Sequence, residues 1–315
     1  MEDKYAPLGG QAVIEGVMMR SPDALAIAVR KPSNKEIVLE IKPVTKNKYS
    51  KIAKMPFIRG IAALVQSMQI GMWALNLSAD IVMKDLDQAE KNGQKVDTEF
   101  KLQGESKVVR YEKKDDVEEE NKSFFDSATG TLSLVFSLVF TIGLFMVLPA
   151  TVFNFLKDKI SNVVLLNVIE GSIRLSIFLI YILAISMMKD VKRLFQYHGA
   201  EHKSIHAYEA GEELTIENAR KHTTIHPRCG TNFLFLTALT SIVLFSLLGR
   251  TDSIALRVIS KISLLPFVAG FSYELIRIAG QIKTKPKNIF VRFAYLLSTP
   301  GMLMLRITTK NPDDT

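Results

Sequence analysis

The sequence predicts a mainly α-helical, polytopic membrane protein with about four transmembrane helices, a small N-terminal module containing a β-hairpin, and a helical, histidine-rich cytoplasmic loop. Three observations lead to this prediction. Hydrophobic residues make up 48% of the 315 residues and occur in long blocks. Two short apolar runs separated by a turn lie near the N-terminus. All five histidines and the only cysteine fall between positions 198 and 229. The fold class therefore follows from how the residues are distributed.

Charge and cysteine content exclude several classes of protein. The net charge of +8 is explained by basic residues that flank the apolar blocks, and no basic and aromatic stripe accompanies it, so we expect no nucleic-acid partner. One cysteine excludes a disulfide within the chain and fits a reducing compartment or a ligand role. The first residues, MEDKYAPLGG, lack the apolar region of a signal peptide.

Residues 1–54 read as a small soluble module. Ala24–Arg30 and Glu36–Lys42 are strand-like runs joined by a turn, which predicts a hairpin. The glycine-rich segment GGQAVIEG at 9–16 lacks the lysine of a P-loop and the spacing of a dinucleotide fingerprint. We therefore interpret it as a tight backbone turn with buried Val and Ile rather than a phosphate-binding loop. Its functional role stays open.

The next two segments contain more polar and charged residues than the later apolar blocks. Residues 55–83 are predicted to form an interfacial or re-entrant helix, because glutamine, asparagine and aspartate interrupt its apolar sequence. Whether this helix crosses the membrane stays open. Residues 84–123 contain EKKDDVEEENK and are predicted to be a charged, flexible excursion.

Four later segments have the length and apolar character of membrane spans. They define a first pair of transmembrane helices in residues 124–188 and a second pair in residues 231–280, with candidate spans at Thr131–Phe153, Val163–Met188, Thr231–Gly249 and Ile262–Ile278. The last segment, residues 281–315, is interrupted by Pro300 and Gly301 and reads as amphipathic rather than spanning.

The second span carries Glu170 and Arg174, four residues apart. Because an unpaired charge in a bilayer is costly, such residues pair or face a cavity. We favour a mutually neutralised pair that fixes helix packing. An ion or proton path through the membrane, which Glu274 would join, is the alternative.

Basic residues set the orientation of the spans. Lysine and arginine are more frequent in the histidine loop and after the fourth span than in the two other loops. This distribution predicts a multi-pass protein of the cytoplasmic membrane with both termini and the histidine loop in the cytoplasm. The lipid bilayer is then its first partner.

The histidine loop, residues 189–230, has the spacing of a metal site. His202, His206 and Glu209 share one helical face, and two imidazoles one turn apart with a carboxylate on the same stripe are typical of a helix that binds zinc. The helix should end near Gly211. A second helix, from Thr215 to just before Pro227, would place His222 and His226 one turn apart, with Cys229 following. The alternative is a polar loop that binds phosphate or a partner.

Five blocks of sequence resemble the YqhQ family of bacterial membrane proteins. They are GGQAVIEGVMMRSP at 9–22, MPFIRG at 55–60, GAEHKSIHAYE at 199–209, HPRCGTNF at 226–233 and PGMLMLRITTKNPDD at 300–314. The family is described mainly as a domain of unknown function, with a suggestion of a metal-dependent enzyme. The resemblance implies a membrane location and a metal. It ranks His198 and His222 lower as ligands, because they lie outside the strongest blocks.

The leading functional hypothesis is a metal-dependent hydrolase at the cytoplasmic membrane surface. Its cofactor would be a divalent metal, with zinc favoured by the ligands. Glu201 would act as general base and Arg228 would neutralise an anionic, lipid-linked or membrane-embedded substrate. The ligands would be drawn from five residues: His202, His206, Glu209, His226 and Cys229. A non-enzymatic scaffold or regulator with a structural metal, and a transporter, are the alternatives. The reaction and the oligomeric state stay open.

Overall fold

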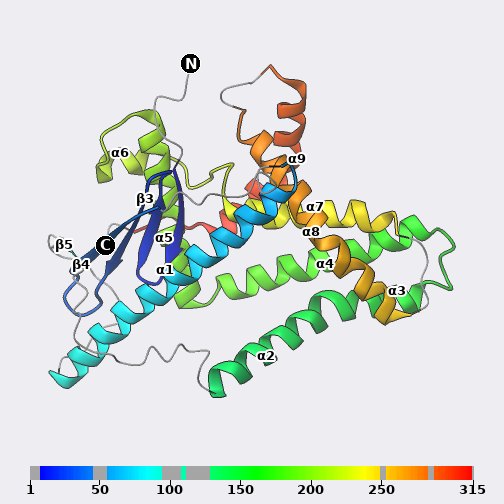
Figure 1. The fold of residues 1–315 in the computed structure, drawn as a ribbon, viewed down its shortest axis with the longest axis horizontal. Helices are drawn as coiled ribbons and strands as arrows, with labels where there is room; N and C mark the ends of the chain where they lie inside the picture. The colour runs from blue at the N-terminus through cyan, green and yellow to red at the C-terminus, as the bar shows by residue number, and fades with distance from the viewer. Residues whose placement is uncertain are drawn as a thin grey trace.

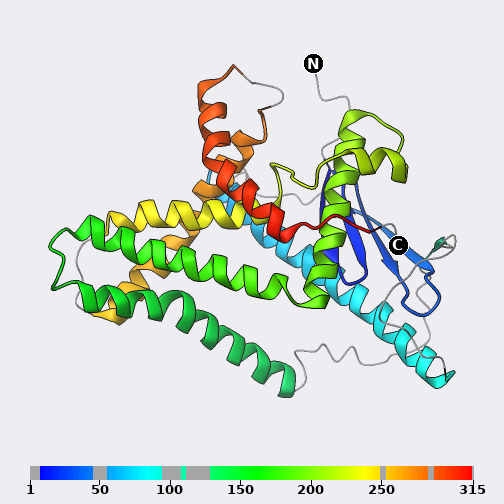
Figure 2. The same ribbon diagram turned by 180° about the vertical axis from the view of Figure 1, so that it is seen from behind.

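The computed structural model describes residues 8–44, 55–93, 108–110, 128–248, 253–282 and 287–313. The chain is mostly helical, with one small sheet near the N-terminus. Long helices run side by side away from the sheet, whereas α1 and α5 flank it (Figures 1 and 2). The histidine-rich segment therefore lies where the sheet meets one end of the long helices.

Four antiparallel strands form the N-terminal sheet, in the order β1 (Gly9–Val13), β2 (Gly16–Arg20), β3 (Ala24–Arg30) and β4 (Ile37–Pro43). The short strand β5 (Val108–Arg110) pairs with β4 in parallel. The predicted hairpin is confirmed as β3 and β4. The interpretation of residues 9–16 as a tight turn was too narrow, because the turn is confined to Ile14 and Glu15 and strands flank it on both sides.

Helix α1 (Ile58–Lys91) packs on one face of this sheet. The shared core consists of small and branched apolar side chains: Val13, Met18, Ile27, Val29 and Val38 from the sheet, and Ala74, Ile81 and Val82 from the helix. Asp85 accepts hydrogen bonds from the backbone and side chain of Ser33 at 2.8 and 2.6 Å. The helix therefore extends past residue 83, into the segment predicted to be flexible. Apart from residues 84–93 and 108–110, that segment lies outside the described residues.

The apolar helices form the elongated part of the molecule. Helix α2 (Ala128–Ile142) continues through a π-helical turn, η3 (Gly143–Val147), into α3 (Leu148–Leu156). It is followed by α4 (Val163–Ser186), α7 (Gly230–Ser246) and α8 (Ile254–Ala279). Among the described residues, three stretches are long and apolar enough to cross a membrane: Val135–Leu156, Val163–Ser186 and Val258–Ala279. The third predicted span corresponds to the shorter apolar helix α7.

A buried charge cluster joins these helices. Nη2 of Arg174 lies 3.4 Å from Oε1 of Glu170, so the two residues pair as predicted. The third member, which was not predicted from the sequence, is Lys261 on α8. It also binds Glu170 and is itself buried. Nε of Arg174 donates to the carbonyl of Phe145 at 2.8 Å, inside the π-helical turn. The cluster therefore links α4 to both α8 and η3.

The histidine-rich segment begins with α5 (Lys189–Ala210), which ends at Gly211 in the left-handed conformation, as predicted. Helix α6 (Ile216–Lys221) begins after Thr215, whose side chain accepts from the backbone N–H of Asn218. It ends at Lys221, so the prediction that His222 and His226 share a helix was wrong. The β-branched run TTI and then Pro227, which disfavours the helical conformation of the residue before it, explain the early end.

The C-terminal part of the described chain returns to α5. Helix α9 (Ile289–Thr308) continues through Pro300, contrary to the expected interruption. The extended residues that follow lie along α5, where the N–H of Lys310 donates to the carbonyl of Phe195 at 2.9 Å. Gly199 permits this close approach, because a Cβ atom there would collide with the carbonyl oxygen of Lys310.

Candidate metal centre

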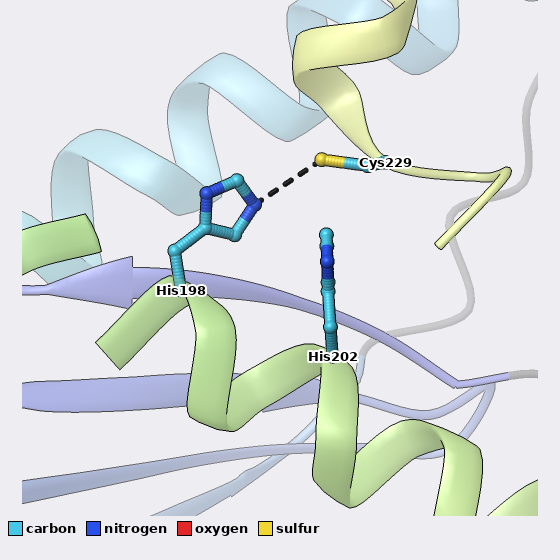
Figure 3. Close-up of side chains that lie close together, drawn as sticks. All are labelled: His198, His202 and Cys229. Carbon is cyan, nitrogen blue, oxygen red and sulfur yellow. Dashed lines mark hydrogen bonds between the residues drawn. The ribbon is translucent and has the colours of Figure 1, made fainter. Parts of the chain in front are cut away.

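His198, His202 and Cys229 form the more buried of two clusters of potential metal ligands. His198 and His202 lie one turn apart on α5, and Cys229 is the N-cap residue of α7. One ligand atom from each residue lies within 4.8 Å of the other two. Figure 3 shows the two imidazole rings directed toward the sulfur, with Nε2 of His198 3.1 Å from Sγ of Cys229. Three potential ligand atoms therefore converge.

Backbone carbonyls orient both histidines. Nδ1 of His198 lies 2.9 Å from the carbonyl oxygen of Thr308, and Nδ1 of His202 is bonded to the carbonyl oxygen of Thr224. A carbonyl oxygen only accepts, so each Nδ1 carries a proton, and in the neutral ring each Nε2 then carries the lone pair. Metal-binding histidines usually donate their second N–H in this way.

The separations suit a tetrahedral ion. At the tetrahedral angle, zinc bonds of about 2.3 Å to sulfur and about 2.0 Å to nitrogen place the two ligand atoms about 3.5 Å apart. The observed distance of 3.1 Å between Nε2 of His198 and Sγ of Cys229 is within a small side-chain rotation of that value. Two nitrogens and one sulfur match the ligand preference of zinc. The residues present therefore fit the metal that the sequence analysis expects.

The surroundings of the Cys229 thiol favour its ionisation. Burial raises the pKa of Cys229. The hydrogen bond and the electrostatic effect of His202, together with the hydrogen bond from the N–H of Thr231, outweigh burial and lower the pKa below its usual value. The N–H of Thr231 lies 3.4 Å from Sγ, at the N-terminus of α7. Because a thiolate is the form that binds a metal, this environment favours a ligand role.

Glu201 lies next to this cluster and is almost completely buried. Its Oε2 has no hydrogen-bond partner in the part of the chain that the structure describes. Burial raises the pKa of Glu201 to about 8, the neighbouring His198 opposes the shift, and Cys229 adds to it. A buried carboxyl oxygen without a partner is uncommon and points to a ligand or proton-transfer role.

The second cluster consists of His206, Glu209 and His226, again with ligand atoms within 4.8 Å of one another. It is more open to solvent, because His206 and Glu209 are only half-buried. Nε2 of His226 lies 3.5 Å from Oε1 of Glu209, and the exposed Arg228 binds the same oxygen. Nε2 of His206 lies 2.9 Å from the carbonyl oxygen of Ile225.

The five predicted ligands are thus divided between two adjacent clusters. His202 and Cys229 belong to the first, whereas His206, Glu209 and His226 belong to the second. The sequence analysis ranked His198 low, although its position one turn before His202 was a usable signal. His222 belongs to neither cluster and lies 3.1 Å from Glu212. Of the two predicted catalytic residues, Glu201 lies beside the first cluster and Arg228 beside the second.

The N-terminal sheet completes the surroundings of the centre. Strand β1 lies against α5, and Gly10 contacts the Glu201 side chain. Glu15 fixes the arrangement, because it binds Arg193 through both carboxylate oxygens and accepts from the hydroxyl of Tyr197 at 3.1 Å. The glycine-rich segment of the sequence thus closes one side of the candidate site.

Comparisons with known proteins cover nearly the whole chain. The family model described as "Protein of unknown function (DUF1385)" matches residues 55–315. The chain is also 32% identical over 311 residues to "Uncharacterized protein YqhQ" of Bacillus subtilis (strain 168), covering 97% of this chain and 87% of that protein. No solved structure matches. From both matches it follows that the chain belongs to the YqhQ family, and that the two ligand clusters lie within the residues matched by its family model.

Proposed function

We propose that this protein is a metal-dependent membrane hydrolase with zinc bound by His198, His202 and Cys229. One observation carries the proposal: two histidines with carbonyl-fixed Nδ1 protons and one cysteine of lowered pKa converge beside Glu201, whose buried Oε2 has no hydrogen-bond partner among the described residues. Three protein ligands leave a fourth position for water or substrate, which is the arrangement of catalytic zinc sites.

The second part of the proposal is a four-span protein of the cytoplasmic membrane with the centre at its inner surface. Helix α7, with 17 residues, has a length of about 25 Å, slightly less than the hydrocarbon thickness. It packs between α4, α8 and α9, and together these contacts support its placement among the spans. Cys229 at its start then lies at the membrane surface, on the side where basic loop residues predominate.

A zinc ion bound here would supply Lewis acidity and lower the pKa of its water ligand. Glu201 would accept the proton released when water attacks the substrate. Its pKa of about 8 applies without a metal, and a nearby dication favours the ionised form, so Glu201 would act as a base near neutral pH. Arg228, which is exposed, would attract an anionic group of a lipid-linked or membrane-embedded substrate.

The test is the metal content of the detergent-purified protein, measured by mass spectrometry. We expect zinc in the wild-type protein. The Cys229→Ser and His198→Ala variants should contain less zinc per chain, because each lacks one ligand of this cluster. His222→Ala is the matched control, because His222 is in the same loop but outside both clusters. If Cys229→Ser retains as much zinc as the wild type, the proposed centre is wrong.

A structural metal site in a membrane scaffold is the second candidate. The near-complete burial of Glu201 favours it, because a carboxylate that becomes the fourth ligand would close the site. X-ray absorption of the zinc-loaded protein distinguishes the two. An unchanged ligand set in Glu201→Gln supports the open, catalytic site, whereas loss of one oxygen ligand supports the closed, structural one.

A further inference from the structure

We infer that His206, Glu209 and His226 bind a second divalent cation beside the first, so that the centre is a two-metal site suited to a phosphoester substrate. This inference rests on the proposed function, because the first ion is the one described there. The five ligands predicted from the sequence were expected to form one site. The structure divides them between two groups, two ligands in one and three in the other, and His198 completes the first group to three.

The second cluster has its own supporting contacts. The carbonyl oxygen of Ile225 accepts from Nε2 of His206, so Nδ1 is the nitrogen with the lone pair. Arg228 binds Glu209, as expected of a metal-ligating carboxylate, which is usually hydrogen-bonded in turn. Nδ1 of His226 accepts from the backbone N–H of Arg228 at 3.3 Å, a long contact. A metal at Nε2 would require the tautomer with the proton on Nδ1, and this one contact would be lost.

The two clusters are close enough to act on one substrate. His202 and His206 are separated by a rise of about 6 Å along α5. The ring of His226 lies 4.8 Å from that of His206 and 5.7 Å from that of His202, measured between centroids. The loop that carries His226 also carries Cys229. A phosphoryl group can therefore contact both ions, with a different oxygen on each.

Charge favours a phosphoester among possible substrates. Two dications and Arg228 would carry five positive charges, and Glu201, Glu209 and Cys229 carry three negative charges when ionised. The net charge of the site is then +2, which a phosphate monoester dianion would neutralise. In hydrolysis the oxygen of water bonds to phosphorus, the bond from phosphorus to the alkoxy oxygen breaks, and the proton of the water passes through Glu201 to the leaving oxygen. Two-metal sites stabilise the attacking and leaving oxygens of such displacements.

Cobalt substitution tests the inference, because only a cobalt ion bound to Cys229 gives a thiolate charge-transfer band. We expect two cobalt ions per wild-type chain. Glu209→Gln and His206→Asn should each retain one ion and the full band, whereas Cys229→Ser should retain one ion without the band. His206→Asn keeps a donor for the carbonyl of Ile225, and His222→Ala, which alters the ring stacked on His206, is the control that should keep both ions.

The outcomes separate the two proposals. One cobalt ion in the wild-type protein, with the band intact in Glu209→Gln, overturns the second site and leaves the proposed function standing. If the wild-type protein shows no thiolate band and Glu209→Gln loses an ion, cobalt binds near Glu209 but not at Cys229. That result overturns both the proposed centre and the two-metal site. Inorganic phosphate should shift the spectrum of the dicobalt protein, and an unchanged spectrum would exclude the phosphoester class.

Discussion

Gly10 and Glu201 are in such close contact that a Cβ atom at position 10 would lie 2.7 Å from Oε1 of Glu201. The first strand and the histidine-bearing helix therefore meet at a position where only glycine fits without displacing the carboxyl group. Gly9, next to it, has nothing within 4 Å of such an added atom. This difference provides a matched pair of substitutions.

We expect Gly10→Ala to lower the free energy of unfolding by about 1–3 kcal/mol, because either β1 or the Glu201 side chain must move. Gly9→Ala should change it by less than about 0.5 kcal/mol, as is usual for exposed positions. Thermal unfolding in detergent would measure both. Equal stability of the two variants would show that the contact is easily relaxed.

The raised pKa of Glu201 predicts how the stability of the metal-free protein depends on pH. Its pKa is about 8 in the folded protein against an ordinary value of 4.5, so the folded state holds a proton that the unfolded state has released. The free energy of unfolding should therefore fall as the pH rises from about 4.5 to about 8. Glu201→Gln removes the titrating group and should flatten this slope. Unfolding midpoints of chelator-treated protein across this range would measure it, and an identical slope in both proteins would contradict it.

The contact between Glu15 and Arg193 should couple the sheet to α5. Both side chains are largely shielded from solvent, with relative exposures of 12% and 22%, and two hydrogen bonds join them. A double-mutant cycle with Glu15→Gln and Arg193→Met should give a coupling energy of about 1–3 kcal/mol. Lys31 and Glu36, at 30% and 19% exposure in the turn between β3 and β4, provide a comparison pair expected to couple by less than about 1 kcal/mol.

The buried charge cluster should respond unequally to loss of its members. Glu170→Gln leaves the cations of Lys261 and Arg174 facing each other, whereas Lys261→Met leaves Glu170 paired with Arg174. Removing one partner of a buried ion pair costs about 3–5 kcal/mol. We expect Glu170→Gln to reach that range, and Lys261→Met to cost clearly less. Unfolding in detergent would rank them, and the reverse order would show that Lys261 is the more important partner.

Local sequence rules predicted those parts of the structure that depend on neighbouring residues. The hairpin of β3 and β4 and the end of α5 at Gly211 follow from turn and capping residues. The helix through His222 and His226 was predicted wrongly, because spacing was given more weight than the TTIHP sequence that prevents helix continuation.

The arrangement of the candidate site depends on contacts between distant segments, which spacing along the chain does not reveal. His198 is oriented by the carbonyl of Thr308, and its partner Cys229 belongs to another helix. Helical periodicity grouped His202 with His206. The loop that precedes α7 instead places Cys229 beside His202 and His226 beside His206, so the two histidines belong to different clusters. Residue types were thus predictable, but their division into two clusters was not.

The contact from His198 to Thr308 sets an order of events in biogenesis. Gly10 and Thr308 border the same centre, so the ribosome must have synthesised nearly all of the described chain before His198 acquires its final orientation. Packing of α7 and α9 has to come first, because these helices bring Cys229 and Thr308 to α5. Metal loading would then be a late step, in a centre that nascent chains stalled before α9 do not possess.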